Sequence, residues 1–266
     1  MKRARLIIAT LCVFIISCTT NPPINQAGLV ELIPFVPEQR ESYVDVLSTP
    51  QDTIRTFFDQ LVINNPDLLE DPNSFLHDDY VERFVTFEEE YNARIQEYDK
   101  ILRECPVPLF IMDLHVFLDE FFMSMTEDIF TLRKGGILGM YVNGLHVKGW
   151  PEEFIFINKN MSSAHIMSTY FHEIKHYECI STKCICTKTT SLWLKEAHAL
   201  EHEIEMSLKH DFPEVLRVST LGVIKYMLDP DQPISYRFAA FRVHRRTMWT
   251  EAMEHLEIYD EKLLKD

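Results

Sequence analysis

The sequence predicts a mostly helical α+β domain that contains a small sheet, and two observations support this. Most of the 266-residue chain repeats apolar residues at the helical period of 3.6. Residues 135–158 instead hold β-prone runs and the dipeptide Asn143-Gly144, which is typical of hairpin turns. The chain also has only 7 glycines against 18 phenylalanines, which favours long helices around an aromatic core over a turn-rich sandwich.

The N-terminus has the organisation of an export signal. Basic residues precede the apolar run Leu6–Ile16, which is too short to span a bilayer. The following Ile-Ile-Ser-Cys at 15–18 resembles the lipobox of bacterial lipoproteins. This resemblance implies removal of residues 1–17, acylation of Cys18 and lipid anchoring in the bacterial cell envelope, at the periplasmic side of the outer membrane in a Gram-negative host. An uncleaved anchor and an ordinary signal peptide are the alternatives.

Composition divides the rest of the chain in two. Residues 18–50 contain five prolines and little helical periodicity, which predicts a tether. The chain is long enough for one large domain or two small ones, and we expect a single domain over residues 51–266. The net charge of −15 argues against a nucleic-acid partner, because binding the phosphates would need a basic surface.

The apolar spacing places the elements of this domain. The sheet is predicted from two segments. The first is a pair of β-prone runs within 136–148, joined at Asn143-Gly144, and the second is a strand over 153–158. Helices are expected over residues 53–62, 78–105, 109–132, 163–177, 191–205, 212–227 and 236–265.

One of these helices carries the motif His-Glu-x-x-His at residues 172–176. Residues four apart on a helix lie one turn above each other, so His172 and His176 can reach one tetrahedral metal ion. Glu173 follows the first histidine and is placed to act as a general base. The apolar stripe on the same helix predicts that it is buried on one side.

A catalytic zinc ion needs a third protein ligand. Glu196 is the best candidate, because it lies on the next amphipathic helix, with nineteen residues between it and His176. Glu201 and Glu203 on the same helix are the alternatives. The remaining histidines near the motif are expected to flank the site or to face solvent. They are His165, His198 and His202.

The stretch Leu-Trp-Leu-Lys-Glu-Ala-His-Ala at 192–199 resembles the second zinc-ligand helix of gluzincin metallopeptidases. With the strand and capped turn before the motif, residues 135–206 are similar to the minigluzincins. The resemblance implies a zincin-like core of a small sheet and two ligand helices, with additional N- and C-terminal helices. It also implies one Zn²⁺ held by His172, His176 and Glu196, with Glu173 as the base. His198 stands where many relatives have Asp, so it leaves the partner of the histidine ligands unidentified.

In that family an extended peptide substrate pairs with an edge strand, for which the candidate here lies in 136–148. The reaction also needs a group that stabilises the oxyanion. The sequence leaves four candidates open, namely Tyr141, Tyr236, His244 and Arg245.

Four cysteines remain beyond the signal region, and in an exported domain they predict two disulfides. Cys184 and Cys186 are separated by one residue, so each is expected to pair with Cys105 or Cys179. A second metal site built from the cysteines near 184 is the alternative.

Together these features predict a membrane-anchored, extracytoplasmic zinc peptidase. Its partners would be a peptide or protein substrate and the membrane, reached through lipidated Cys18. A non-catalytic lipoprotein that keeps the fold as a binding or structural module is the competing hypothesis. A structural zinc site closed by His198 is a third.

Overall fold

The structure is a computed structural model that describes residues 40–49, 52–57, 78–122, 138–144, 147, 149–182, 192–230 and 232–263. The predicted signal peptide, Cys18 and most of the predicted tether lie outside these residues, as do Cys184 and Cys186. None of the described helices is long and apolar enough to cross a membrane.

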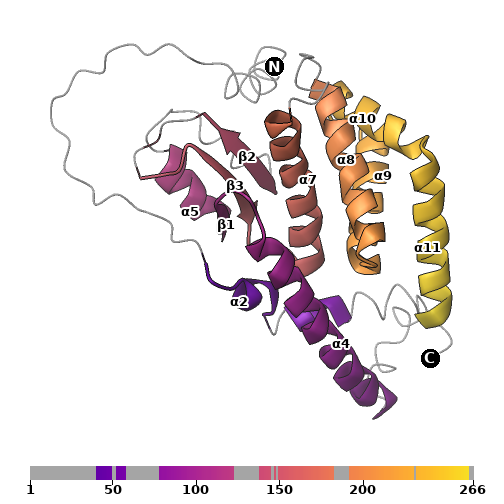
Figure 1. Cartoon of the computed structure of the whole chain (residues 1–266). Coiled ribbons are helices and arrows are strands. Elements are labelled where there is room, and N and C mark those ends of the chain that lie inside the picture. The colour runs from indigo at the N-terminus through magenta and orange to yellow at the C-terminus, as the bar shows by residue number, and fades with distance from the viewer. Residues whose placement is uncertain are drawn as a thin grey trace, which may run out of the picture.

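A three-stranded mixed sheet forms one side of the molecule (Figure 1). Its strands are β1 (Leu109–Met112), β2 (Gly139–Asn143) and β3 (Glu153–Asn158). β3 lies in the centre, parallel to β1 and antiparallel to β2. The predicted α+β class and the strand at 153–158 are therefore confirmed.

Helices make up most of the rest of the described chain. They are α2 (Val44–Leu47), α4 (Asp78–Arg103), α5 (Leu114–Phe117), α7 (Ser163–Ser181), α8 (Leu192–Lys209), α9 (Pro213–Leu228), α10 (Ile234–His244) and α11 (Thr247–Leu263). A short π-helix, Leu118–Phe122, follows α5 directly. Residues 52–57 are also helical, while the rest of the helix expected up to 62 lies outside the described residues.

The prediction of one buried helix from 109 was wrong at its start, because residues 109–112 form strand β1. Both faces of this strand are covered, so every position is apolar and the period of two is hidden. Asp113 then stops the strand and caps α5, where its side chain accepts a hydrogen bond from the backbone N–H of His115.

Strand β2 ends at the dipeptide where a hairpin turn was predicted. Gly144 has a positive φ of 76° and donates its backbone N–H to Glu152, so the chain reverses there. β2 pairs with β3, whereas residues 145, 146 and 148, in the second predicted β-prone run, lie outside the described residues. Val147 and Trp150, from the connection, pack into the apolar core beside the sheet.

The single C-terminal helix expected over 236–265 is two helices, α10 and α11. α10 ends at His244 with Arg245 as its C-cap, and the next residues form a turn in which Trp249 donates its backbone N–H to Arg246. This turn lets both helices pack on α8 and α9. The sequence has no glycine or proline at the break, so helical periodicity alone does not reveal it.

The predicted tether ends earlier than residue 50. Tyr43 and Leu47 are fully buried against α4 and the sheet, and the Tyr43 hydroxyl donates to the carbonyl of Leu109. The backbone N–H of Tyr43 also donates to Asp99 on α4. The folded domain therefore includes residues 40–49, ahead of the predicted boundary at 51.

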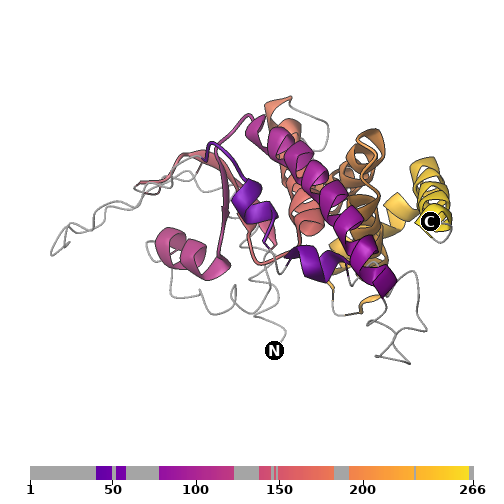
Figure 2. The same cartoon turned by 90° about the horizontal axis from the view of Figure 1, so that it is seen from below.

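The apolar core has three parts. One lies between the sheet, α4 and α7, and a second fills the opposite face of the sheet with aromatic side chains from α5 and the π-helix. The third joins α8, α9, α10 and α11. Figure 1 shows these groups side by side, with α7 next to the sheet and α8 beyond it; Figure 2 shows α4 crossing in front of α7.

Candidate metal centre

α7 carries the His-Glu-x-x-His motif and is held in place by an N-terminal cap and by a buried apolar face. Ser162 caps its N-terminus by accepting a hydrogen bond from the backbone N–H of His165. Its apolar face, which includes Ile166, Tyr170 and Phe171, packs in the core against the sheet and α4. The two motif histidines lie beside that buried face and are themselves half-buried.

α8 brings the carboxylates from the opposite direction. Its own apolar face, Ala197, Leu200 and Ile204, belongs to the helical core with α9, α10 and α11. α8 also packs along α7. Glu196 and Glu203 lie buried where the two helices meet, as the spacing of the second amphipathic helix predicts.

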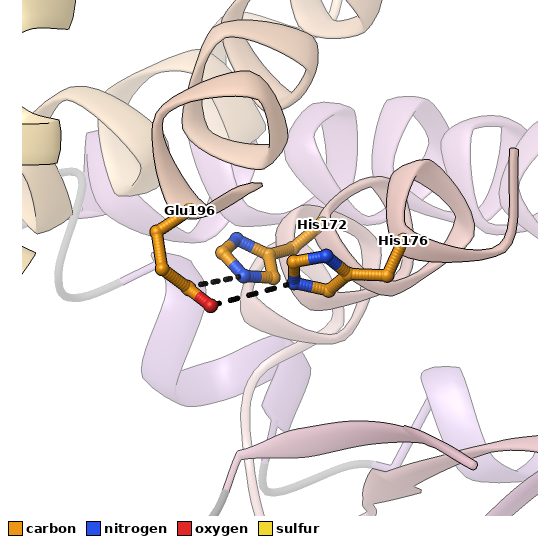
Figure 3. A group of neighbouring side chains, drawn as sticks. All are labelled: His172, His176 and Glu196. Carbon is orange, nitrogen blue, oxygen red and sulfur yellow. Dashed lines mark ion pairs between the residues drawn. The ribbon is translucent and has the colours of Figure 1, made fainter. Parts of the chain in front are cut away.

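The predicted ligands converge (Figure 3). The Nε2 atom of His172 lies 3.3 Å from one carboxylate oxygen of Glu196, and Nε2 of His176 lies 3.8 Å from the other. One ligand atom from each of the three side chains lies within 4.8 Å of the others. Tetrahedral zinc with bonds of about 2.0–2.2 Å needs neighbouring ligand atoms roughly 3.4 Å apart. His172, His176 and Glu196 can therefore hold a metal ion.

Glu203 identifies the partner of His172 that the sequence left open. Its carboxylate lies 2.7 Å from Nδ1 of His172, on the side of the ring away from Glu196. Ser168 donates to the other oxygen of Glu203 at 2.6 Å, and Ser168 in turn contacts the hydroxyl of Ser219 at 3.0 Å. This series of hydrogen bonds holds the imidazole of His172 with Nε2 facing Glu196. Residues that hydrogen-bond the second nitrogen of a metal-binding histidine commonly orient its ring in this way.

Glu173 lies against the edge strand of the sheet. The backbone N–H of Tyr141 in β2 donates to its carboxylate at 2.8 Å. Burial raises the pKa of Glu173 to about 7, and the nearby Glu196 adds to this effect. Gly139 permits the close approach, because a Cβ there would lie 2.4 Å from Cγ2 of Thr169 and 3.1 Å from Cγ of Glu173.

The ligand groups differ in protonation. Burial lowers the pKa of His176 to about 4, which keeps its imidazole neutral and able to bind a metal. Burial also acts to lower the pKa of His172, but hydrogen bonds to Glu196 and Glu203 outweigh it and raise that pKa. Burial acts to raise the pKa of Glu196, yet the hydrogen bond from His172 leaves it lowered, so the carboxylate is ionised.

The other candidates from α8 have different contacts. Glu201 accepts from Arg242 at 3.4 Å and from Arg246 at 3.0 Å, so it pairs with α10 and the turn after it. His198 is not among the residues grouped with the motif histidines in the described chain. His202 is buried beside α7, and burial lowers its pKa to about 4.

The four oxyanion candidates have unequal positions. The Tyr141 hydroxyl donates to Glu153 at 2.5 Å and contacts Asn143, so only its backbone serves Glu173. Arg245 lies over the ring of Phe241, and the ring of His244 packs against Trp249.

Tyr226 on α9 is a residue that the sequence reasoning missed. Its ring packs against Tyr236 with centroids 5.6 Å apart. Burial raises the pKa of its phenol, and the charges of His172, Glu203, Glu196 and Glu173 contribute to that pKa. No described residue hydrogen-bonds its hydroxyl. The sequence gives no sign of the position of Tyr226, because that position depends on how α9 packs on α7 and α8.

The predicted disulfides are not seen in the described chain. Cys105 and Cys179 are both buried and form no disulfide there. Burial raises the pKa of the Cys105 thiol, which lies beside Tyr170 of α7. The expected partners Cys184 and Cys186 lie outside the described residues.

Comparisons with known proteins add no relative. No family model, no curated protein and no solved structure matches this chain. The function of this protein is therefore inferred from the chain's own residues.

Proposed function

We propose that this protein is a zinc-dependent peptidase of the gluzincin type, anchored outside the cytoplasm by an acylated Cys18. The observation that carries the proposal is the placement of Glu173. It is a buried acid with a raised pKa, and it stands directly beside three side chains that can hold a metal ion. A site needed only for metal storage has no use for such an acid.

His172, His176 and Glu196 would hold the ion. Once metal binding displaces the proton of His172, two imidazole nitrogens and one carboxylate form a ligand set that suits zinc, and they leave one tetrahedral position for other molecules. When bound, the ion would polarise a carbonyl group and lower the pKa of water.

Glu173 then acts as general base and acid. With a pKa of about 7 it can accept the proton of the attacking water and donate it to the leaving amine nitrogen. The N–H of Tyr141 holds the carboxylate in place, and Gly139 leaves the space for it.

Tyr226 takes the role of stabilising the oxyanion. Its hydroxyl has no partner among the described residues and is near the same cluster, so it can donate to the carbonyl oxygen as negative charge develops there. We prefer Tyr226 to Tyr141, whose hydroxyl is held by Glu153.

The substrate would lie extended along β2. The carbonyl of Leu138 accepts a hydrogen bond from the backbone N–H of Asn158 at the end of β3, so the backbone groups of Leu138 point towards β3. The backbone N–H of Tyr141 donates to Glu173 instead and points away from β3. Because these directions alternate along an antiparallel strand, the backbone groups of Gly139 also point away from β3. The carbonyls of Gly139 and Tyr141 are thus on the outer edge, where an extended peptide can pair with them.

The test is cleavage of a peptide library by the full chain. Glu173→Gln is expected to lower the cleavage rate about 10²–10⁴-fold while leaving the zinc content of the protein unchanged. Tyr226→Phe is expected to lower it by about 10²–10³-fold, also without loss of zinc. Glu201→Gln is the matched control, because this acid on the same helix pairs with Arg242 and Arg246 instead.

Two results would contradict the proposal. If the wild type binds zinc and cleaves nothing, the protein is a non-catalytic module, which is the competing hypothesis. If Glu173→Gln cleaves as fast as the wild type, the mechanism is wrong.

A further inference from the structure

α10 has one face in the core and an apolar opposite face in solvent. Ala239, Ala240 and Val243 are completely buried against the neighbouring helices. Ile234, Phe238 and Phe241 are 69%, 58% and 52% exposed. Their spacing of four and three residues aligns them in one ridge along the helix. Large exposed apolar residues gathered in this way mark an interaction surface.

The charge around this ridge differs from that of the whole protein. The chain carries a net charge of −15, yet residues 233–250 contain four arginines and no acid. Arg242 and Arg246 are paired with Glu201 of α8. Arg237 and Arg245 form no ion pair with any described residue, and the Arg245 guanidinium lies 5.6 Å from the centroid of the Phe241 ring.

We propose that this surface, the α10 ridge formed by Ile234, Arg237, Phe238, Phe241 and Arg245, docks on an anionic lipid bilayer. An exposed apolar ridge with aromatic rings can enter the acyl boundary of a membrane, as the apolar face of an interfacial helix does. Anionic headgroups attract each nearby arginine. The ridge offers both features on one helix face.

A second copy of the chain fits the ridge less well. A symmetric dimer would place the ridge of one copy against that of the other, and Arg237 and Arg245 would then face like charges. A bilayer meets the apolar and cationic parts at the same time and needs no complementary shape.

Chain length makes the contact attainable. Twenty-one residues lie between Cys18 and Arg40, so a lipid on Cys18 would keep the start of the domain within about 75 Å of the bilayer even if that segment were fully extended. α10 packs directly on α8, which carries Glu196. Docking would thus hold the metal centre one helix away from the lipid surface. The proposal does not depend on peptidase activity.

The experiment measures how close the ridge lies to lipid in the full chain reconstituted with vesicles. Phe241→Trp adds a reporter on the ridge, and Val116→Trp adds one on α5, where Val116 is 45% exposed on the far side of the sheet. Lipids brominated on their acyl chains quench tryptophan only at short range. In vesicles containing phosphatidylglycerol, the added fluorescence of Phe241→Trp is expected to be quenched severalfold more than that of Val116→Trp.

A charge variant separates docking from chance proximity. Arg237→Glu/Arg245→Glu, introduced into Phe241→Trp, should reduce the quenching to the level of Val116→Trp, and high salt should weaken it. Circular dichroism checks that each variant is folded. Equal quenching at positions 241 and 116 overturns the proposal. So does a dimer of the wild type, seen by analytical ultracentrifugation in detergent, that Phe241→Ser converts to monomer.

Discussion

The two halves of the molecule are packed by different kinds of side chain. On the sheet side, Phe117 stacks on Phe156 with ring centroids 3.8 Å apart, and Trp150 meets Phe117 edge-on. On the helical side, the completely buried residues include small ones such as Ala197 and Ala240. Small side chains let helices approach closely, whereas the sheet is filled by large rings.

The metal centre lies where these halves meet. α7 is fixed by the core beside the sheet, and α8 is fixed by the helical core. Between them runs a buried polar row in which His172 from α7 contacts Glu196 and Glu203 from α8. Each half can therefore be disturbed separately, while a bound ion would join them.

The largest expected effect is in the sheet half. Phe156→Ala should lower the free energy of unfolding by about 3–5 kcal/mol, because it removes a completely buried ring and leaves a cavity. Ala240→Leu in the helical half should cost about 1–3 kcal/mol through overpacking. Urea unfolding measures both. Phe238→Ala, at an exposed position, should change stability by less than about 0.5 kcal/mol. A larger cost for Ala240→Leu would show that the helical half has the tighter core.

Zinc should stabilise the connection between the halves. At a zinc concentration 100 times the dissociation constant, the expected gain is about 2.7 kcal/mol. For a chain of this size that corresponds to a rise in Tm of roughly 5–10 °C over protein treated with a chelator. Calorimetry measures the shift. His176→Gln should abolish it, and a shift that survives in this variant would place the zinc elsewhere.

A change at Glu203, the hydrogen-bond partner of His172, is expected to have a smaller effect. Glu203→Gln should weaken zinc binding about 10–100-fold, because the amide no longer carries the charge that fixes the His172 imidazole. Competition with a chelating dye measures the affinity. Glu201→Gln changes the same residue type two positions earlier and should leave the affinity unaltered. Equal losses in the two variants would point to an effect of α8 charge in general.

Local sequence patterns were enough to predict much of the candidate site. Two histidines at helical spacing and Glu196 on the next amphipathic helix need only the helical period, and the structure brings all three together. The strand at 153–158 was predicted from its run of alternating Phe and Ile residues, and the structure confirms it.

The parts that the sequence did not reveal depend on contacts between distant elements. Glu203 was considered as a ligand, and only the packing of α8 on α7 shows that it holds Nδ1 of His172 instead. Tyr226 reaches the site from α9, and Tyr43 packs onto α4 and the sheet from the predicted tether. Strand β1 was read as helix because burial on both faces removes the alternation that distinguishes strands.

The smallest effect concerns pH and the contact between α7 and α8. His202 of α8 is buried there, facing Glu178 and Lys175 of α7 as well as Lys209 of its own helix and His172. Burial lowers its pKa from 6.5 in the unfolded chain to about 4. The unfolded chain therefore binds more protons between these values. The contribution of neutral His202 to stability is fully present above about pH 6.5 and is lost as the pH falls towards 4.

The change can be at most about 1.4 kcal/mol per pH unit for one histidine. His176 also has a pKa lowered to about 4, so it adds a similar slope in metal-free protein. Urea unfolding of chelator-treated protein at several pH values between 6.5 and 4 should give a shallower slope for His202→Gln than for the wild type, without removing the slope altogether. Identical slopes would mean that His202 is protonated in the folded protein, and that the contact between the two helices accommodates its charge.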